Sequence, residues 1–454
     1  MKVKMILPAL VATKKRGIKS RLFPWLGGVS IAAYFGSQDQ VVLQDENVEQ
    51  LDLHDEPELV VIQVYISSSN HAYELADHYR KKGAYVCLGG LHVTSLPEEA
   101  AQHADSIFLG PGEDTWPQFL KDFRNGIPQR RYVSVTRTLE HAPPIRRDLI
   151  KRDLYLVPNS IVVSRGCPHQ CDFCYVKAFF QDGRHFYTQA VDTALAEIER
   201  LPGRHVYFLD DHLLGNPRFF AALCNGMKGM GKKWQGASTV QSILQHPDLV
   251  KKGAEAGLCS LFVGFETLSE ENLRGQNKYQ NLNRDYGEAI CIARDNGVMI
   301  NGSFVFGMDD DDESVFRRTV EWGVAEGIET ATYHIMTPYP GTALYQRMQD
   351  AGRLLHSNWD LYDTRHVVYQ PARMSPEALE TGYHWAYENF YRWSNIWKGA
   401  AVKDDWWGRL RHLAYAGGWK KFEGVWNALI FAEQVSVMVP VLERVLSTHT
   451  ADSA

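Results

Sequence analysis

Short apolar runs alternate with helix-like stretches in the first part of the chain. The helix-like stretches include residues 69–83, which end at Gly83, and residues 96–104. Apolar strands that alternate with helices form parallel sheets whose two faces are both covered by helices. The pattern therefore predicts an N-terminal α/β domain of the doubly wound, Rossmann-like kind. The strand-like runs are VVLQDE at 41–46, LVVIQVYI at 59–66, AYVCLGG at 84–90 and SIFLGPGE at 106–113.

Small and polar residues follow these strands. In open α/β sheets, ligands bind beyond the carboxyl ends of the strands, so these turns are candidates for a cofactor crevice. Such residues are equally typical of ordinary strand-to-helix turns, and spacing alone does not separate the two interpretations. The turn residues are Ser67, Ser68 and Ser69 after one strand, Gly89, Gly90, His92 and Thr94 after the next, and Gly110, Gly112 and Glu113 after the third.

The α/β alternation resumes after a linker rich in proline and arginine at residues 124–149. About six strand–helix units then follow in sequence, which predicts a full or partial parallel (βα)6 barrel. From about Ser375 the pattern changes to helices with many aromatic residues. We expect three domains, at residues 1–135, 136–370 and 371–454. The barrel strands are expected at IVVSRG (161–166), HVYFLDD (205–211), GASTV (236–240), SLFVGFE (260–266), MINGSFVFG (299–307) and TATYHIMTPYPGT (330–342).

Length and charge narrow the class of protein. A chain of 454 residues is longer than one core usually organises. The net charge of −6 provides no global basic field for nucleic acid. No apolar run reaches the roughly 20 residues of a spanning helix, and the N-terminus is not a signal peptide. We therefore expect a cytoplasmic protein, in which clustered cysteines serve metal or redox chemistry rather than a disulfide.

Three of the seven cysteines, Cys167, Cys171 and Cys174, lie within the stretch SRGCPHQCDFCYVK. Structural zinc sites usually take four ligands, and no CxxC or HxxxH partner follows this stretch. Iron–sulfur clusters are also normally held by four thiolates. Three thiolates on a four-iron cluster leave one iron open to a substrate or cofactor. The other cysteines of the later chain, Cys224, Cys259 and Cys291, stand singly and are more typical of buried structural thiols.

The spacing Cx3Cx2C, with Phe173 just before the last cysteine, resembles the signature of the radical S-adenosylmethionine (SAM) enzymes. As in that family, it follows the first expected barrel strand. The resemblance implies a [4Fe–4S] cluster on Cys167, Cys171 and Cys174. It also implies SAM contacts at Phe173 in the cysteine stretch, and in the stretches YFLDDHLLGN, VGFET, NGSFVFG and TPYPGTALY, where the contacts are Asp210, Asp211, Glu266, Ser303, Gly307 and Pro338.

The stretch LGGLHVTSLPEEAAQHADSIFLGPGEDTW is similar to the B12-binding domain of the cobalamin-dependent branch of this family. The expected B12-binding domain of this chain, residues 1–135, lacks an Asp-x-His-x-x-Gly loop, so the resemblance implies cobalamin whose cobalt has no histidine beneath it, or a degenerate domain that binds no corrin. The cobalamin contacts implied are Ser67, Ser68, Gly89, Gly90, His92, Thr94, Gly110, Gly112 and Glu113.

The resemblance implies radical chemistry: cleavage of SAM yields a 5′-deoxyadenosyl radical that abstracts a hydrogen atom from an unactivated carbon. With methylcobalamin present, the substrate radical receives a methyl group, and a second SAM remethylates the cobalamin. We interpret the protein as a methyltransferase supplied by an electron donor such as a flavodoxin or ferredoxin. One alternative is oxidative cyclisation or hydroxylation of a tetrapyrrole without methyl transfer. Another is an electron-transfer iron–sulfur protein, which would not cleave SAM.

Seven of the twelve tryptophans lie between Trp385 and Trp426, interleaved with lysine and arginine. The simplest interpretation is a helical cap packed on the barrel. Adjacent Trp406 and Trp407 must point to different sides of a helix, and indoles beside cations also suit a membrane interface. We therefore expect this segment to close the barrel mouth, to help admit a large apolar substrate such as a tetrapyrrole or polycyclic lipid, and to allow peripheral membrane contact.

Overall fold

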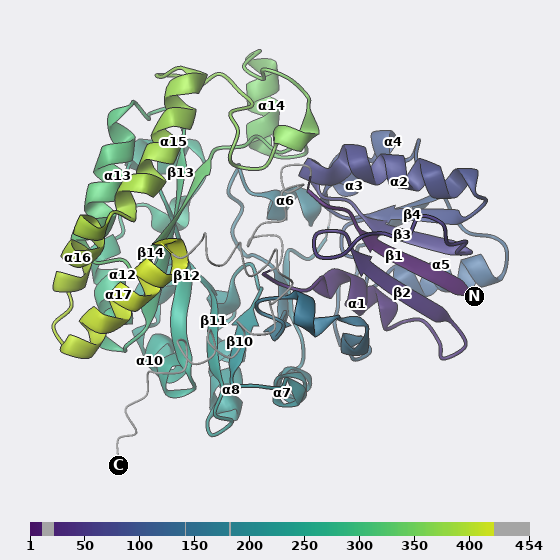
Figure 1. Ribbon diagram of the computed structural model, residues 1–454, viewed down its shortest axis with the longest axis horizontal. Helices are drawn as coiled ribbons and strands as arrows, with labels where there is room; N and C mark the ends of the chain where they lie inside the picture. The colour runs from purple at the N-terminus through teal and green to yellow at the C-terminus, as the bar shows by residue number, and fades with distance from the viewer. Residues whose placement is uncertain (11–21, 141, 181–182, 422–454) are drawn as a thin grey trace.

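The computed structural model describes residues 1–10, 22–140, 142–180 and 183–421 (Figure 1). Its first layer is a six-stranded sheet in the order β2-β1-β3-β4-β5-β6, and every neighbouring pair is parallel. The strand order reverses between β1 and β3, which is where such sheets bind ligands. The strands are β1 (Lys2–Leu7), β2 (Gln40–Asp45), β3 (Leu59–Gln63), β4 (Tyr85–Gly89), β5 (Ser106–Leu109) and β6 (Arg131–Val133).

Helices cover both faces of this sheet, as its apolar strands require. Alternate residues of β1 face opposite ways: Met5 packs with α1 and α5, whereas Ile6 packs with α2. The doubly wound arrangement predicted for the N-terminal part is therefore confirmed. The helices are α1 (Leu26–Ala32) and α5 (Trp116–Arg124) on one face, with α2 (Ser69–Lys81), α3 (Leu91–Ser95) and α4 (Pro97–Ala100) toward the other.

The second layer is an open six-stranded parallel sheet in the order β14-β13-β12-β11-β10-β7. In the described part of the chain its edge strands β7 and β14 do not pair, so the barrel is partial rather than closed. The strands are β7 (Ser160–Ile161), β10 (His205–Phe208), β11 (Lys233–Ser238), β12 (Leu258–Glu266), β13 (Met299–Phe306) and β14 (Thr330–Ile335).

Helices pack on the outer face of this open barrel and build the largest apolar core among the described residues. The buried residues of this core include Trp234, Phe265, Phe304 and Tyr333 from the strands. The covering helices are α7 (Val191–Arg200), α8 (Pro217–Met227), α10 (Pro247–Glu255), α12 (Tyr286–Asp295) and α13 (Ser314–Ala325), while α9 (Val240–Gln245), α11 (Glu270–Gly275) and α14 (Ala343–Asp350) follow strand ends.

The run IVVSRG does not form one strand as predicted. Only Ser160–Ile161 pairs with β10, and the chain then leaves the sheet. Residues Ser164–Gly166 form β8, which pairs antiparallel with β9 (Phe186–Thr188) as a separate two-stranded sheet. The cause is a side chain: the buried Asp210 carboxylate accepts the backbone N–H groups of Val163 and Ser164. These groups therefore have no need of a neighbouring strand.

The predicted linker connects the two sheets through specific contacts. It contains β6, the sixth strand of the first sheet, and a short 3-10 turn, Arg147–Leu149; a second 3-10 turn, Arg152–Leu154, follows the linker. The Tyr155 hydroxyl donates to Asp45 at the end of β2 at 3.0 Å. These contacts fix the N-terminal sheet relative to the barrel, while the exact division at residues 135 and 370 stays a prediction.

The C-terminal helices are α15 (Pro376–Phe390), α16 (Trp393–Ala401) and α17 (Trp406–Lys421). The expectation that this segment closes the barrel mouth is wrong for its described part. Lys403, between α16 and α17, forms a buried ion pair of 2.6 Å with Glu329, just before β14. Arg411 of α17 donates to the carbonyl oxygen of Gly297, just before β13, at 2.8 Å. Both contacts lie at the amino ends of the strands, opposite the mouth (Figure 1).

Among the described residues, no helix is both long and apolar enough to cross a membrane.

Candidate active site

A cavity of about 640 Å³ lies between the carboxyl ends of the two parallel sheets. On one side it is lined by residues that follow β3, β4 and β5, including Gly90 and Gly110. On the other side it is lined by Leu209 and Asp211 after β10, and by Tyr339 after β14. Each sheet thus contributes the end at which α/β proteins bind ligands.

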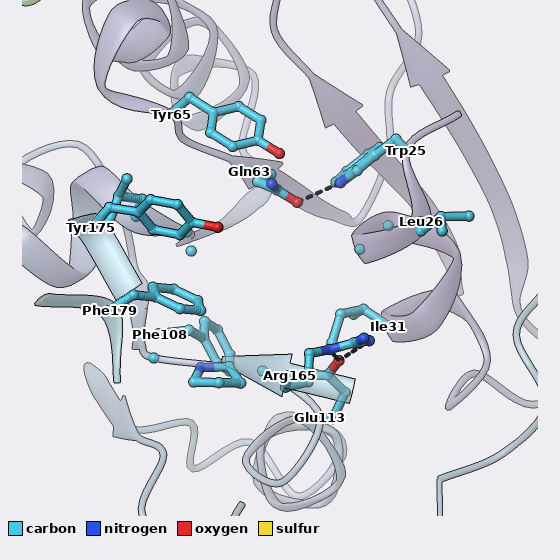
Figure 2. Close-up of a pocket in the computed structure, with 18 of the residues that line it drawn as sticks. Trp25, Leu26, Ile31, Gln63, Tyr65, Phe108, Glu113, Arg165, Tyr175 and Phe179 are labelled. Carbon is cyan, nitrogen blue, oxygen red and sulfur yellow. Dashed lines mark hydrogen bonds and ion pairs between the residues drawn. The ribbon is translucent and has the colours of Figure 1, made fainter. Parts of the chain in front are cut away.

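The wall of the cavity is largely apolar and aromatic (Figure 2). Trp25, Phe108 and Phe179 present rings to it, and the hydroxyl groups of Tyr65 and Tyr175 point into its open centre. Such a wall, with a few placed polar groups, is typical of a site for a large organic ligand.

The predicted cobalamin residues divide into two sets. Ser68, His92 and Thr94 are buried and do not line the cavity. Thr94 instead holds two of the lining turns together: its hydroxyl donates to the carbonyl oxygen of Gly90 and accepts the N–H of Gly110, both at 2.9 Å. The predicted residues that do line the cavity are Ser67, Gly89, Gly90, Gly110, Gly112 and Glu113.

Gly90 must be glycine for this wall to form. Its φ of 113° lies in the left-handed region that side chains rarely adopt. A β-carbon built there would come within 2.8 Å of the carbonyl oxygen of Val64. The turn therefore brings bare backbone to the cavity, which suits a large flat ligand.

The described residues that line the cavity include no histidine. His92 is fully buried, and its Nε2 lies 2.8 Å from a Glu99 carboxylate oxygen. His71 pairs with Glu46, with 2.7 Å between Nε2 and Oε2. The cavity thus fits a corrin without a histidine ligand from its described wall.

An ion pair joins the two sides of the cavity. Arg165, in the strand β8 just before the cysteine loop, contacts Glu113 of the N-terminal domain at 2.9 Å (Figure 2). Both side chains are largely buried, at 19% and 11% exposure. The pair fixes the turn after β5 against the strand that carries the cysteines.

The three cysteines lie in the loop between β8 and α6 (Tyr175–Phe179). All three are free thiols. Burial raises the pKa of Cys167 to about 11 and raises that of Cys174 further. A bound metal deprotonates such thiols outright, so buried thiols suit cluster ligands.

Within the described residues, no three His, Cys, Asp or Glu side chains converge on a position for one metal ion. Each thiolate of a four-iron cluster binds a different iron, so its ligands do not need to converge on one point. The donor set of three neighbouring thiols in one loop therefore fits such a cluster.

Asp210 and Asp211 act differently despite being neighbours. Asp210 is 3% exposed, and it accepts from the backbone of Val163 and from the backbone and hydroxyl of Ser164. Burial raises its pKa to about 6, although these donors oppose the rise. Asp211 lines the cavity, accepts the N–H of Gly166 at 3.2 Å and accepts the Tyr175 hydroxyl. Asp210 thus positions the cysteine loop, while Asp211 is available to a ligand.

Glu266 ends β12 in a strained conformation. Its φ of 66° is unusual for a residue with a side chain, and the strand register shifts just before it. Its buried carboxylate pairs with Lys278 at 2.6 Å. Although burial lowers the pKa of Lys278, Glu266 and the nearby thiols more than offset this and raise it overall. A fixed cation therefore lies between Glu266 and the cysteine loop.

The other predicted SAM residues lie on or after neighbouring strands. Ser303 on β13 is paired in register with Gly264 of β12, two residues before Glu266. Gly307 follows β13 with a φ of 95°, and its N–H donates to Asp311 at 2.9 Å. Pro338 is buried after β14, and Phe173 has Lys278 Nζ 5.9 Å from its ring centre.

Several residues of the site belong to no motif that would have identified them from the sequence. Lys278 and Gln280 come from the segment after α11, more than a hundred residues from the cysteines, and Gln280 Nε2 lies 3.1 Å from Cys171 Sγ. Trp25 and Arg165 also line the cavity. Tyr175 is the exception, because its place next to Cys174 could have suggested a role.

Residues 161–323 match the family model described as "Radical SAM superfamily". One relative is a bacteriochlorophyllide d C-12(1)-methyltransferase of Chlorobaculum tepidum, 29% identical over 76% of this chain and 76% of the relative. Another is a hopanoid C-2 methylase of Rhodopseudomonas palustris, 25% identical over 74% of this chain and 66% of the relative.

The fold is also similar to a solved structure, the radical S-adenosylmethionine methyltransferase TsrM from Kitasatospora setae with cobalamin and a [4Fe–4S] cluster bound. The TM-score is 0.66 at 14% identity, and the match covers 96% of this chain and 99% of TsrM. The two sheets and the cysteine loop therefore define the fold class of two-domain radical SAM enzymes. Residues 161–323 therefore form a radical SAM domain, and the fold of the whole chain is similar to that of a radical SAM methyltransferase that binds cobalamin. A [4Fe–4S] cluster and SAM are accordingly its cofactors.

Replacing Cys167, Cys171 or Cys174 singly by alanine should prevent assembly of a complete cluster and abolish SAM cleavage. Each thiolate binds its own iron, so the remaining two cannot compensate. Iron and sulfide content after anaerobic reconstitution, with 5′-deoxyadenosine formation, measures this. Cys224→Ala is the control, because that thiol is buried in the barrel core. The assignment fails if any loop variant retains a full cluster and cleaves SAM normally.

The cavity should bind a corrin with no protein histidine beneath cobalt. Electron paramagnetic resonance of the cob(II)alamin form then shows no nitrogen superhyperfine splitting from an axial histidine. A split spectrum would contradict this expectation, and protein that takes up no corrin would identify the first domain as degenerate.

Proposed function

We propose that the protein is a cobalamin-dependent radical SAM methyltransferase that acts on an unactivated carbon of a large apolar substrate. The observation that carries the proposal is the single cavity lined both by the glycine turns of the first sheet and by residues next to the cysteine loop. Gly90 and Gly110 line one side, while Tyr175 and Asp211 line the other. A methyl donor held by the first side would face a radical generated at the second.

Specific residues would hold each cofactor. Cys167, Cys171 and Cys174 would hold the cluster, which supplies the electron that cleaves SAM. Cobalamin would lie against the glycine turns and supply the methyl group. The protein's part is to orient the cofactors and to exclude water. The SAM contacts proposed are Phe173, Asp211, Glu266, Ser303, Gly307 and Pro338, with Asp210 acting through the backbone that it holds.

The apolar wall of the cavity favours a large, hydrophobic substrate. Rings of Trp25, Phe108 and Phe179 would pack against a tetrapyrrole or a polycyclic lipid, but offer little to a sugar or a peptide. The relatives that methylate a bacteriochlorophyllide and a hopanoid support the same substrate classes. Oxidative chemistry on a tetrapyrrole without methyl transfer is the alternative for the same site.

Enzyme reduced by dithionite or by reduced flavodoxin, supplied with SAM carrying a CD3 group, should transfer that group to a bacteriochlorophyllide-type or hopanoid substrate. Mass spectrometry should detect replacement of one substrate hydrogen by CD3. It should also detect 5′-deoxyadenosine and S-adenosylhomocysteine, because one SAM starts the radical and another supplies the methyl group. Product formation without the CD3 mass gain would support the oxidative alternative. Absence of SAM cleavage would contradict both.

We extend the proposal to the surroundings of the enzyme. All seven cysteines are free thiols, which suits the reducing cytoplasm. Four exposed tryptophans lie on α16 and α17: Trp393 at 48%, Trp397 at 60%, Trp406 at 70% and Trp407 at 65% exposure. Exposed indoles beside Lys398 and Arg409 are typical of a membrane interface. This surface would hold the enzyme near membrane-borne substrate, although it lies away from the cavity.

Replacing Trp397 and Trp406 together by alanine should weaken binding to anionic phospholipid vesicles about a hundredfold or more, because each buried indole contributes on the order of 1.5 kcal/mol and the two together about 3 kcal/mol. Vesicle co-sedimentation measures the change. Ile127→Ala, which alters an exposed apolar residue of the first domain, is the matched control. Equal vesicle binding by the wild type and the double variant would rule out this surface as the membrane contact.

A further inference from the structure

Residues 276–281, which follow α11, contact the cysteine loop although they lie about a hundred positions later in the chain. The backbone N–H of Asp172 donates to the carbonyl oxygen of Gln276 at 3.0 Å. The Asn277 side-chain amide donates to the Asp172 carboxylate at 2.8 Å. Gln280 approaches the cysteine itself, with 3.1 Å between its Nε2 and Cys171 Sγ.

Gln280 is buried and firmly held. It lies in the 3-10 turn η7 (Tyr279–Asn281) and is 7% exposed. The neighbouring Asn281 amide donates to the carbonyl oxygens of Gly264 and Phe265 in β12, at 2.8 and 3.0 Å. The turn is thus tied to the barrel sheet on one side and to the cysteine loop on the other.

The chemistry of a cluster ligand fixes the direction of the Gln280 contact. A thiolate bound to iron carries no proton, so it can only accept a hydrogen bond. The amide N–H of Gln280 must therefore face Cys171 Sγ when the cluster is in place. In the described part of the chain, this is the hydrogen bond that joins a side chain to one of the three loop sulfurs.

We propose that Gln280 tunes the reduction potential of the cluster through its hydrogen bond to Cys171, an inference that rests on the proposed function. Hydrogen bonds to cluster sulfurs are among the factors that set the potential. The donated N–H withdraws electron density from the sulfur and stabilises the extra electron of the reduced cluster. Gln280 therefore makes the cluster easier to reduce, in addition to the fixed charge of Lys278 nearby. It is a positioning residue, which acts on the cluster through Cys171.

Gln280→Leu removes the donor while keeping a similar side-chain volume. We expect its midpoint potential to be more negative, with the reduction equilibrium weakened about tenfold, which corresponds to about 59 mV for one electron. The measurement is a redox titration of the reconstituted, SAM-free protein followed by electron paramagnetic resonance. Gln280→Met provides a second variant without the donor. Gln241→Leu is the matched control, because Gln241 lines the same surface hollow of about 530 Å³ but donates to none of the loop sulfurs in the described structure.

Each outcome has one meaning. A negative shift in both Gln280 variants, with the Gln241 variant unchanged, supports the proposal. Wild-type potentials in fully loaded Gln280 variants overturn it. Loss of the cluster in both Gln280 variants also overturns it and assigns the residue to cluster assembly. A wild-type protein that holds no cluster contradicts the proposed function itself and is thereby distinguished from a failure of this inference.

Discussion

The buried carboxylate of Asp210 determines where the cysteines lie. After Ile161 the chain could continue beside β10, but Asp210 takes the N–H groups of Val163 and Ser164 that a neighbouring strand would otherwise pair. A buried N–H must be paired, so this one side chain replaces the sheet as the partner. The chain then turns out of the barrel as the hairpin of β8 and β9.

That departure lets the two domains share one site. Arg165 of the displaced strand reaches Glu113 in the turn after β5, so the cysteine loop and the cavity wall are fixed to each other. On the opposite side of the cavity, the hydroxyl of Thr94 links the two glycine turns by hydrogen bonds to Gly90 and Gly110. Because both sheets present their carboxyl ends to the same space, cofactors held by different domains would meet across one cavity of about 640 Å³.

The sequence was most informative where the signal is local. Strand runs follow from unbroken apolar stretches, and the cluster ligands follow from three thiols within one loop. The break after Ile161 was missed because it depends on Asp210, which lies 47 positions from Val163. Gln280 was missed for the same reason, since 109 positions separate it from Cys171.

The C-terminal helices show that amino-acid composition does not predict where a segment packs. Four of their tryptophans are highly exposed. Composition could not say at which end of the barrel the helices lie. That is decided by single polar contacts, such as the pair between Lys403 and Glu329, which no periodic pattern encodes.

The most direct test of a shared site is the magnetic interaction between cob(II)alamin and the reduced cluster in one protein molecule. If both lie across the same cavity, the reduced cluster should shorten the spin relaxation of cob(II)alamin, and the Cys171→Ala variant should lose this effect. Relaxation of cob(II)alamin that is the same with and without a reduced cluster would contradict the account.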